Sequence, residues 1–88
     1  MHEQSLVEAL VRQIEGVAHD ECAARVVAAH VWVGALSHVQ TRDHFQEHFD
    51  RAAKGTVAEG AEVRLTMSDD PTHEDANGLR LERIEIEE

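Results

Sequence analysis

The chain has 88 residues, one cysteine and a formal net charge of −10, from 18 acidic residues against 8 lysines and arginines. This length provides one domain with a modest core, and the acidic excess disfavours nucleic acid and anionic membranes as partners. It favours cationic partners or divalent metals, although acidity also serves plain solubility. The single cysteine excludes an internal disulfide and any multi-cysteine zinc site. The sequence has neither a signal-peptide pattern nor an apolar run of membrane-spanning length, so we expect a cytoplasmic protein.

The opening triplet Met1-His2-Glu3 suggests a metal chelate. The α-amine of Met1, the amide nitrogen of His2 and the Nδ1 of its ring would close two adjacent chelate rings around a square-planar ion, which is the geometry that suits Ni(II) or Cu(II). A histidine in second place leaves one coordination position open for another ligand, and an open position allows the ion to be handed over. The triplet alone also fits a histidine placed there by chance.

An amphipathic helix is predicted directly after the triplet, because apolar residues recur at helical spacing. Ser5 and Glu8 have the spacing of a capping box, which predicts a helix start at Ser5 that anchors the terminal residues near the domain. The apolar stripe consists of Leu6, Val7, Leu10, Val11, Ile14, Val17 and Ala18.

Residues 25–33 are rich in β-branched side chains and alternate, which predicts a first strand. Strict alternation assigns its side chains to two faces. One face holds Val27, Ala29, Val31 and Val33, and the other holds Val26, Ala28, His30 and Trp32.

A second helix and two further strands complete the predicted fold. Thr41 can cap the helix, and Gly55 can end it. In the last strand the apolar residues shift from odd to even positions between Leu81 and Ile84, which predicts a bulge near Glu82 and Arg83. The polar residues 68–78 are predicted to form an exposed loop before this strand. The order α-β-α-β-β predicts an α/β (α+β) two-layer domain, with two helices packed on a three-stranded mixed sheet. The residues of the helix that are expected to face the core are Phe45, Phe49, Ala52 and Ala53. The apolar positions that predict the strands are Ala61, Val63, Leu65 and Met67 for the second, and Leu79, Leu81, Ile84 and Ile86 for the third.

Four sequence runs in matching order and spacing carry a resemblance to a known family. They are Met1-His2-Glu3 with Ser5-Leu6, Val33-Gly34-Ala35-Leu36-Ser37, Gly55-Thr56-Val57-Ala58-Glu59-Gly60-Ala61, and Gly78-Leu79-Arg80-Leu81-Glu82-Arg83-Ile84-Glu85-Ile86. With them, nearly the whole chain resembles the HypA/HybF family of nickel metallochaperones, which serve the maturation of nickel-iron hydrogenases. The resemblance implies a single nickel-binding-type domain over residues 1–88. The resemblance also implies that the protein acts together with a HypB-like GTPase on the hydrogenase large subunit.

The resemblance implies that His2 and the Glu3 backbone bind Ni(II), and the chelate geometry described above adds Met1. Family members often carry an acidic residue in the loop after the first strand, where this chain has Gln40, a weaker and neutral ligand. His38 lies in the same loop and can replace the missing carboxylate. Its alternative role is that of an exposed loop histidine.

One departure from the family leaves a second functional hypothesis open. Members normally insert a zinc-binding domain with paired CxxC motifs between the last two strands, and this chain has only the short loop of residues 68–78 there. We therefore expect no structural zinc. The alternative function is a HypA-like protein-interaction adaptor that has lost nickel delivery along with the zinc domain, although an adaptor has no chemical need for His2.

The run His44-Phe45-Gln46-Glu47-His48 matches the His-x-x-Glu-His signature of inverted zinc peptidases. Such an enzyme needs a third ligand and a cleft that a domain of this size does not offer, and we expect no enzyme. Two imidazoles one helical turn apart fit either an adventitious clamp for Zn(II) or Ni(II) or a solvated helix face. Cys22 is expected to be a small buried residue, and His30 and Trp32 to be packing residues. Exposed strand edges leave a homodimer open.

Overall fold

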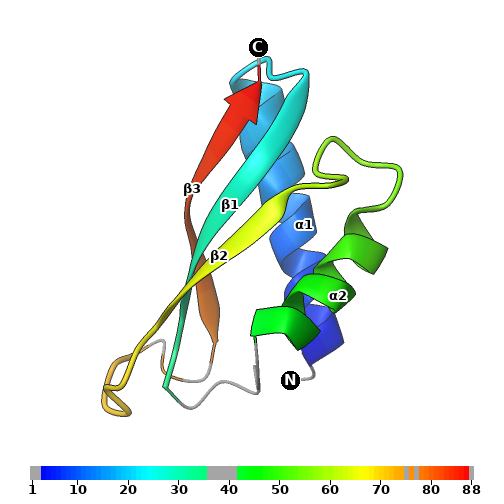
Figure 1. Ribbon diagram of the computed structural model, residues 1–88. Helices are drawn as coiled ribbons and strands as arrows, with labels where there is room; N and C mark the ends of the chain where they lie inside the picture. The colour runs from blue at the N-terminus through cyan, green and yellow to red at the C-terminus, as the bar shows by residue number, and fades with distance from the viewer. Residues whose placement is uncertain (1–2, 36–41, 75, 77, 88) are drawn as a thin grey trace.

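The computed structural model describes residues 3–35, 42–74, 76 and 78–87 of the chain. Both helices cover one face of a three-stranded sheet, and no helix of the described residues covers the opposite face (Figure 1). The α-β-α-β-β order and the two-layer architecture predicted from the sequence are therefore confirmed. The elements are α1 (Glu3–Asp20), β1 (Arg25–Val33), α2 (Arg42–Ala53), β2 (Glu62–Met67) and β3 (Leu79–Glu87).

The sheet has the strand order β2-β1-β3, so β1 is the central strand. It pairs in parallel with β2 and antiparallel with β3. A parallel pair needs a crossover connection, and α2 supplies it between β1 and β2. Within the described residues, neither helix is long and apolar enough to cross a membrane.

Two bulges interrupt the pairing of β1 with β3. His30 pairs with Arg83 and Val31 with Leu81, which leaves Glu82 as an extra residue and confirms the bulge predicted there. A second irregularity lies on β1 between Val26 and Ala28. The sequence analysis missed it, and its assignment of faces was wrong at this point.

The missed bulge leaves Val27 as the extra residue of β1 and reverses the alternation before it. Val26 is fully buried in the core, whereas Val27 is 40% exposed. The predicted faces of Ala29, Val31 and Val33 are correct, because these residues follow the bulge.

The apolar stripes of both helices pack together over β1. Phe45 and Phe49 of α2 are completely buried, as predicted, and the stripe of α1 is buried except for Val17, which is 38% exposed. The helix α1 begins at Glu3, so Ser5 lies within the helix and is not its cap. Glutamate and glutamine are good helix formers, and an acidic residue is favourable in the first turn. The helix therefore extends two residues beyond the predicted start.

The turn after α1 explains why Cys22 is exposed and not buried as the sequence analysis expected. The amide of Ala23 donates to the Ala18 carbonyl at 2.9 Å, and the amide of Cys22 donates to the His19 carbonyl at 3.1 Å. These two bonds form a Schellman motif, in which the residue at the position of Cys22 adopts a left-handed conformation. Cys22 has φ 53° accordingly, and the turn leaves its thiol exposed.

Gln46 ties α2 to the start of β2. Its side-chain oxygen accepts a hydrogen bond from the Val63 amide at 2.8 Å, and its side-chain nitrogen donates to the Ala61 carbonyl at 3.2 Å. The Gln46 side-chain amide thus pairs with the backbone of Ala61 and Val63 in the way that a neighbouring strand would. This contact fixes the rotation of α2, and hence the direction in which its exposed side chains point.

We predict opposite effects for alanine at two glycines that have open space around them. Gly55 follows α2 with φ 82°, whereas Gly16 lies inside α1, and a Cβ at either site meets no atom within 4 Å. Gly55→Ala should lower the free energy of unfolding by about 1–2 kcal/mol through left-handed backbone strain. Gly16→Ala should raise it by about 0.5–1 kcal/mol, since alanine favours the helix. Urea denaturation measures both, and a stable Gly55→Ala variant would contradict the role of Gly55 as the helix stop.

We also predict that Gln46→Ala lowers the free energy of unfolding by about 1–3 kcal/mol, because the buried Val63 amide loses its acceptor. Glu47→Ala is the matched control on the same helix. It removes only the exposed Glu47–Arg51 ion pair at 3.4 Å, and an exposed pair of this kind contributes little. Equal denaturation midpoints for the two variants would show that the Gln46 bridge does not stabilise the fold.

Candidate metal centre

The predicted nickel ligands fall mainly outside the part of the chain that the structure describes. Met1, His2, His38 and Gln40 lie outside the described residues, and Glu3 is described as the first residue of α1. The predicted ligand set therefore remains a prediction. Within residues 3–35, 42–74, 76 and 78–87, no three histidine, cysteine, aspartate or glutamate side chains are grouped so that they could hold a metal ion.

The described segments that flank these residues meet at one end of the molecule. The start of α1, the end of β1 and the start of α2 all lie at the lower end in Figure 1. The loop after β2 is tied to the same end, because the Ser68 amide donates to the Val33 carbonyl and the Gly34 amide to the Gly78 carbonyl, each at 2.8 Å.

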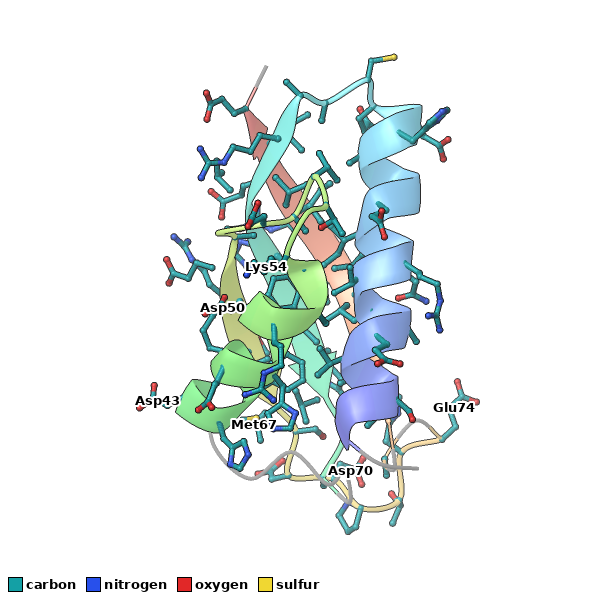
Figure 2. The ribbon with its side chains drawn as sticks, turned by 90° about the vertical axis from the view of Figure 1, so that its right-hand side faces the viewer. Asp43, Asp50, Lys54, Met67, Asp70 and Glu74 are labelled. Carbon is teal, nitrogen blue, oxygen red and sulfur yellow. The ribbon has the colours of Figure 1, made fainter. Side chains whose placement is uncertain are left out.

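Acidic side chains gather at this end of the molecule. Figure 2 shows Asp43 near the start of α2, and Asp70 and Glu74 in the loop between β2 and β3. The pKa of Asp70 is lowered because its carboxylate accepts hydrogen bonds from the Thr72 hydroxyl at 2.6 Å and the Thr72 amide at 2.9 Å. Asp70 is therefore ionised at neutral pH and contributes negative potential at this end.

A histidine pair lies on the outer surface of α2. The Nε2 atoms of His44 and His48 are 3.1 Å apart, and their ring centroids are separated by 4.8 Å. His48 also lines a cavity of about 160 Å³ between α1 and α2, together with Val7, Glu8, Arg51 and Ala52. The spacing noted in the sequence thus brings the two imidazoles into direct contact.

The open face of the sheet carries a polar cluster that the sequence analysis did not predict. His30 of β1 donates from Nε2 to Oε2 of Glu85 on β3 at 2.6 Å, and Arg64 of β2 approaches the same oxygen at 3.4 Å. These residues are far apart in sequence, and only the strand register brings them together. The β2-β1-β3 order would have revealed the cluster, but no local pattern specifies that order.

Trp32 lies on the same open face and packs between two elements. The His73 ring is 4.7 Å from it, and the Arg80 guanidinium lies 5.2 Å from its centroid. The contact agrees with the predicted packing role of Trp32 and attaches the loop after β2 to the sheet. His30, in contrast, donates a hydrogen bond to the Glu85 carboxylate.

Comparison with known proteins gives a consistent result at the level of sequence. The family model described as "Hydrogenase/urease nickel incorporation, metallochaperone, hypA" matches residues 1–73. The hydrogenase maturation factor HypA of Archaeoglobus fulgidus is 36% identical over 76% of this chain and 60% of its own length. HypA of Thermococcus kodakarensis is 40% identical over 74% of this chain and 46% of its own length. HybF of Salmonella typhimurium is 38% identical over 74% of this chain and 57% of its own length.

A solved structure supports the fold. The solution structure of the Ni metallochaperone HypA from Helicobacter pylori matches with a TM-score of 0.78 and 20% identity, covering 98% of this chain and 97% of the other. At this identity the likeness concerns the fold alone. The alignments with the three sequence relatives span about half to three fifths of each relative's length.

The fold is that of a small two-layer α/β domain. The chain belongs to the HypA/HybF family of hydrogenase nickel metallochaperones. A metallochaperone binds and transfers a metal without transforming a substrate, so family membership supports the expectation that this protein is not an enzyme.

We predict that the contribution of Glu85 to stability depends on pH. The His30 hydrogen bond, aided by the Arg64 and Arg83 charges, holds the pKa of Glu85 below its ordinary value of 4.5. A lowered folded-state pKa stabilises the fold above pH 4.5, and this stability is lost as the pH falls through the lowered pKa. Glu85→Gln should therefore be less stable than the wild type at pH 7, with a difference that closes in acid.

The control for this prediction is Glu82→Gln, at the bulge position that lacks a cross-strand partner on β1. Thermal unfolding of the wild type and both variants across pH 3–7 provides the measurement. A gap between the wild type and Glu85→Gln that stays constant over this pH range would show that the His30–Glu85 contact does not favour the ionised carboxylate.

Proposed function

We propose that this chain binds Ni(II) through Met1, His2 and Glu3 and delivers it during the maturation of nickel-iron hydrogenase. The observation that carries the proposal is the family match over residues 1–73, which includes the terminal triplet. A HypB-like GTPase and the hydrogenase large subunit are the proposed partners. Nickel is the cargo in this scheme.

The start of α1 is chemically suited to a chelate that uses backbone nitrogens. The first amides of a helix have no acceptor within the helix, so a metal can bind them without breaking a helical hydrogen bond. Square-planar Ni(II) requires such an amide nitrogen to lose its proton, and the positive end of the helix dipole favours the resulting negative charge. Since α1 begins at Glu3, the proposed ligand set ends on the first helical residue.

Packing and charge give this helix start further support as a cation site. Leu6 and Val7 are 8% and 1% exposed, so the first turns of α1 are fixed against the core. Asp43, Asp70 and Glu74 lie at the same end of the molecule (Figure 2). Their negative potential raises the local concentration of divalent cations, which speeds encounter with Ni(II).

The auxiliary ligand is proposed to come from the loop between β1 and α2, which contains His38 and Gln40. The described ends of this connection, at Ala35 and Arg42, belong to segments at the same end of the molecule as the start of α1 (Figure 1). An imidazole is a better ligand for Ni(II) than a neutral amide oxygen, so we assign the larger contribution to His38.

We predict that untagged wild-type protein binds one Ni(II) tightly at a site with a square-planar absorption band. His2→Ala should lose this band and its tight binding, and acetylation of the terminal amine should weaken binding, because each change removes a nitrogen donor. His38→Ala should weaken binding by about tenfold, a loss of about 1.4 kcal/mol. Calorimetry with parallel absorption spectroscopy provides the measurement.

The matched control is His19→Ala, which removes an exposed histidine at the opposite end of α1. It should leave the Ni(II) titration unchanged. Equal Ni(II) binding by the wild type and His2→Ala would reject the terminal chelate and favour the adaptor function.

A further inference from the structure

The His44–His48 pair has the geometry of a metal chelate that is separate from the terminal triplet. The two residues lie four positions apart on α2, so their side chains project from the same face of the helix. Their Nε2 atoms are 3.1 Å apart. Zn–N bonds of about 2.0–2.1 Å place two coordinating nitrogens roughly 2.9 Å apart at a right angle and roughly 3.3 Å apart at a tetrahedral angle.

The observed separation lies between these two values, so the distance between the two nitrogens suits shared binding of one ion. In the present contact one ring donates its Nε2 hydrogen to the Nε2 of the other. A neutral imidazole can carry its hydrogen on Nδ1 instead. After that change of tautomer each Nε2 can offer a lone pair to one ion, and no proton has to leave the protein.

The helix that carries the pair is rigid. Phe45 and Phe49 hold the opposite face of α2 in the core, and both are completely buried. Gln46 links the same helix to β2 through two hydrogen bonds. Because the backbone is fixed by these contacts, the two imidazoles are already positioned, and binding requires little further ordering.

The surroundings of the pair are favourable for a cation and accessible to water. His44 is exposed and His48 is half-buried, so ligand positions away from the protein can be filled by water. Glu8 and His48 line the same cavity of about 160 Å³ between α1 and α2, which brings a carboxylate close to the pair. Arg51 also lines this cavity, and its charge is paired with Glu47 at 3.4 Å.

We propose that His44 and His48 form a second metal site that binds one late first-row divalent cation through both Nε2 atoms. Water completes the coordination. Imidazole nitrogen suits Zn(II), Ni(II) and Cu(II) and selects against Mg(II) and Ca(II), which prefer oxygen. The site does not depend on the proposed nickel chelate, because it uses neither the terminal amine nor a backbone nitrogen.

Zn(II) is the probe that separates the two sites. Zn(II) prefers tetrahedral coordination, so we expect it to bind weakly to the square-planar chelate proposed at the terminus. Zn(II) is titrated by calorimetry into untagged wild-type protein, His44→Ala, His48→Ala, His2→Ala and His19→Ala. Circular dichroism of each variant checks that the helices are retained, and the thermal midpoint is measured with and without Zn(II).

We expect one Zn(II) per wild-type chain, and an affinity lower by about tenfold or more in His44→Ala and in His48→Ala. His2→Ala and His19→Ala should bind Zn(II) as the wild type does. Zn(II) should raise the thermal midpoint of the wild type but not of His44→Ala, since a ligand bound only to the folded state stabilises that state.

Wild-type affinity in a folded His44→Ala variant would overturn the second site, and so would loss of Zn(II) binding in His2→Ala. His44 is exposed, so its replacement tests the proposal even if His48→Ala disturbs the packing beside Ala52. The Ni(II) absorption band of His44→Ala distinguishes a failure of the second site from a failure of the proposed nickel function. If His44→Ala keeps the Ni(II) band but loses Zn(II) binding, the protein has two separate sites. Loss of the Ni(II) band in His2→Ala, without loss of Zn(II) binding in His44→Ala, would support only the terminal chelate.

Discussion

The structure depends on the burial of one face of β1 beneath both helices. The helices α1 and α2 lie on the same side of the sheet, so their buried apolar side chains share one core with those of the central strand and its neighbours. Val26, Ala29, Val31 and Val33 of β1 are fully buried there against Phe45 and Phe49. Burial of apolar surface is the main favourable term in folding, and a domain of this size has only one such core.

This one-sided core explains the character of the rest of the molecule. Among the residues that the structure describes, no helix lies over the second face of the sheet, which carries polar side chains including the His30–Glu85–Arg64 cluster. At one end, Trp32 packs with His73 and Arg80 and so holds the loop after β2 against the sheet. The helices in turn present their polar faces to solvent, and the metal-binding chemistry proposed for the protein lies on α2 and at the start of α1.

The two proposed metal sites differ in what fixes them. The terminal chelate is specified by three consecutive residues, and its donors need no distant element. The histidine pair needs a helix for its spacing and a buried opposite face for its rigidity, which Phe45 and Phe49 provide. The histidine pair lies close to Glu8 only because α1 and α2 pack against each other. Both proposed sites use residues of the α/β domain and no CxxC motif.

The sequence by itself determined the elements and the candidate ligands, because these depend on local patterns. Apolar spacing predicted both helices and all three strands, Gly55 marked the end of α2, and the phase change near Glu82 predicted its bulge. The tertiary structure decided which face Val26 and Val27 take, why Cys22 is exposed, and which residues meet across the sheet. These features follow from strand register, from the backbone conformation of one turn, and from the packing of distant segments. Two residues separated by 55 positions, such as His30 and Glu85, become neighbours only when β1 and β3 pair in one register, and no local pattern encodes that contact.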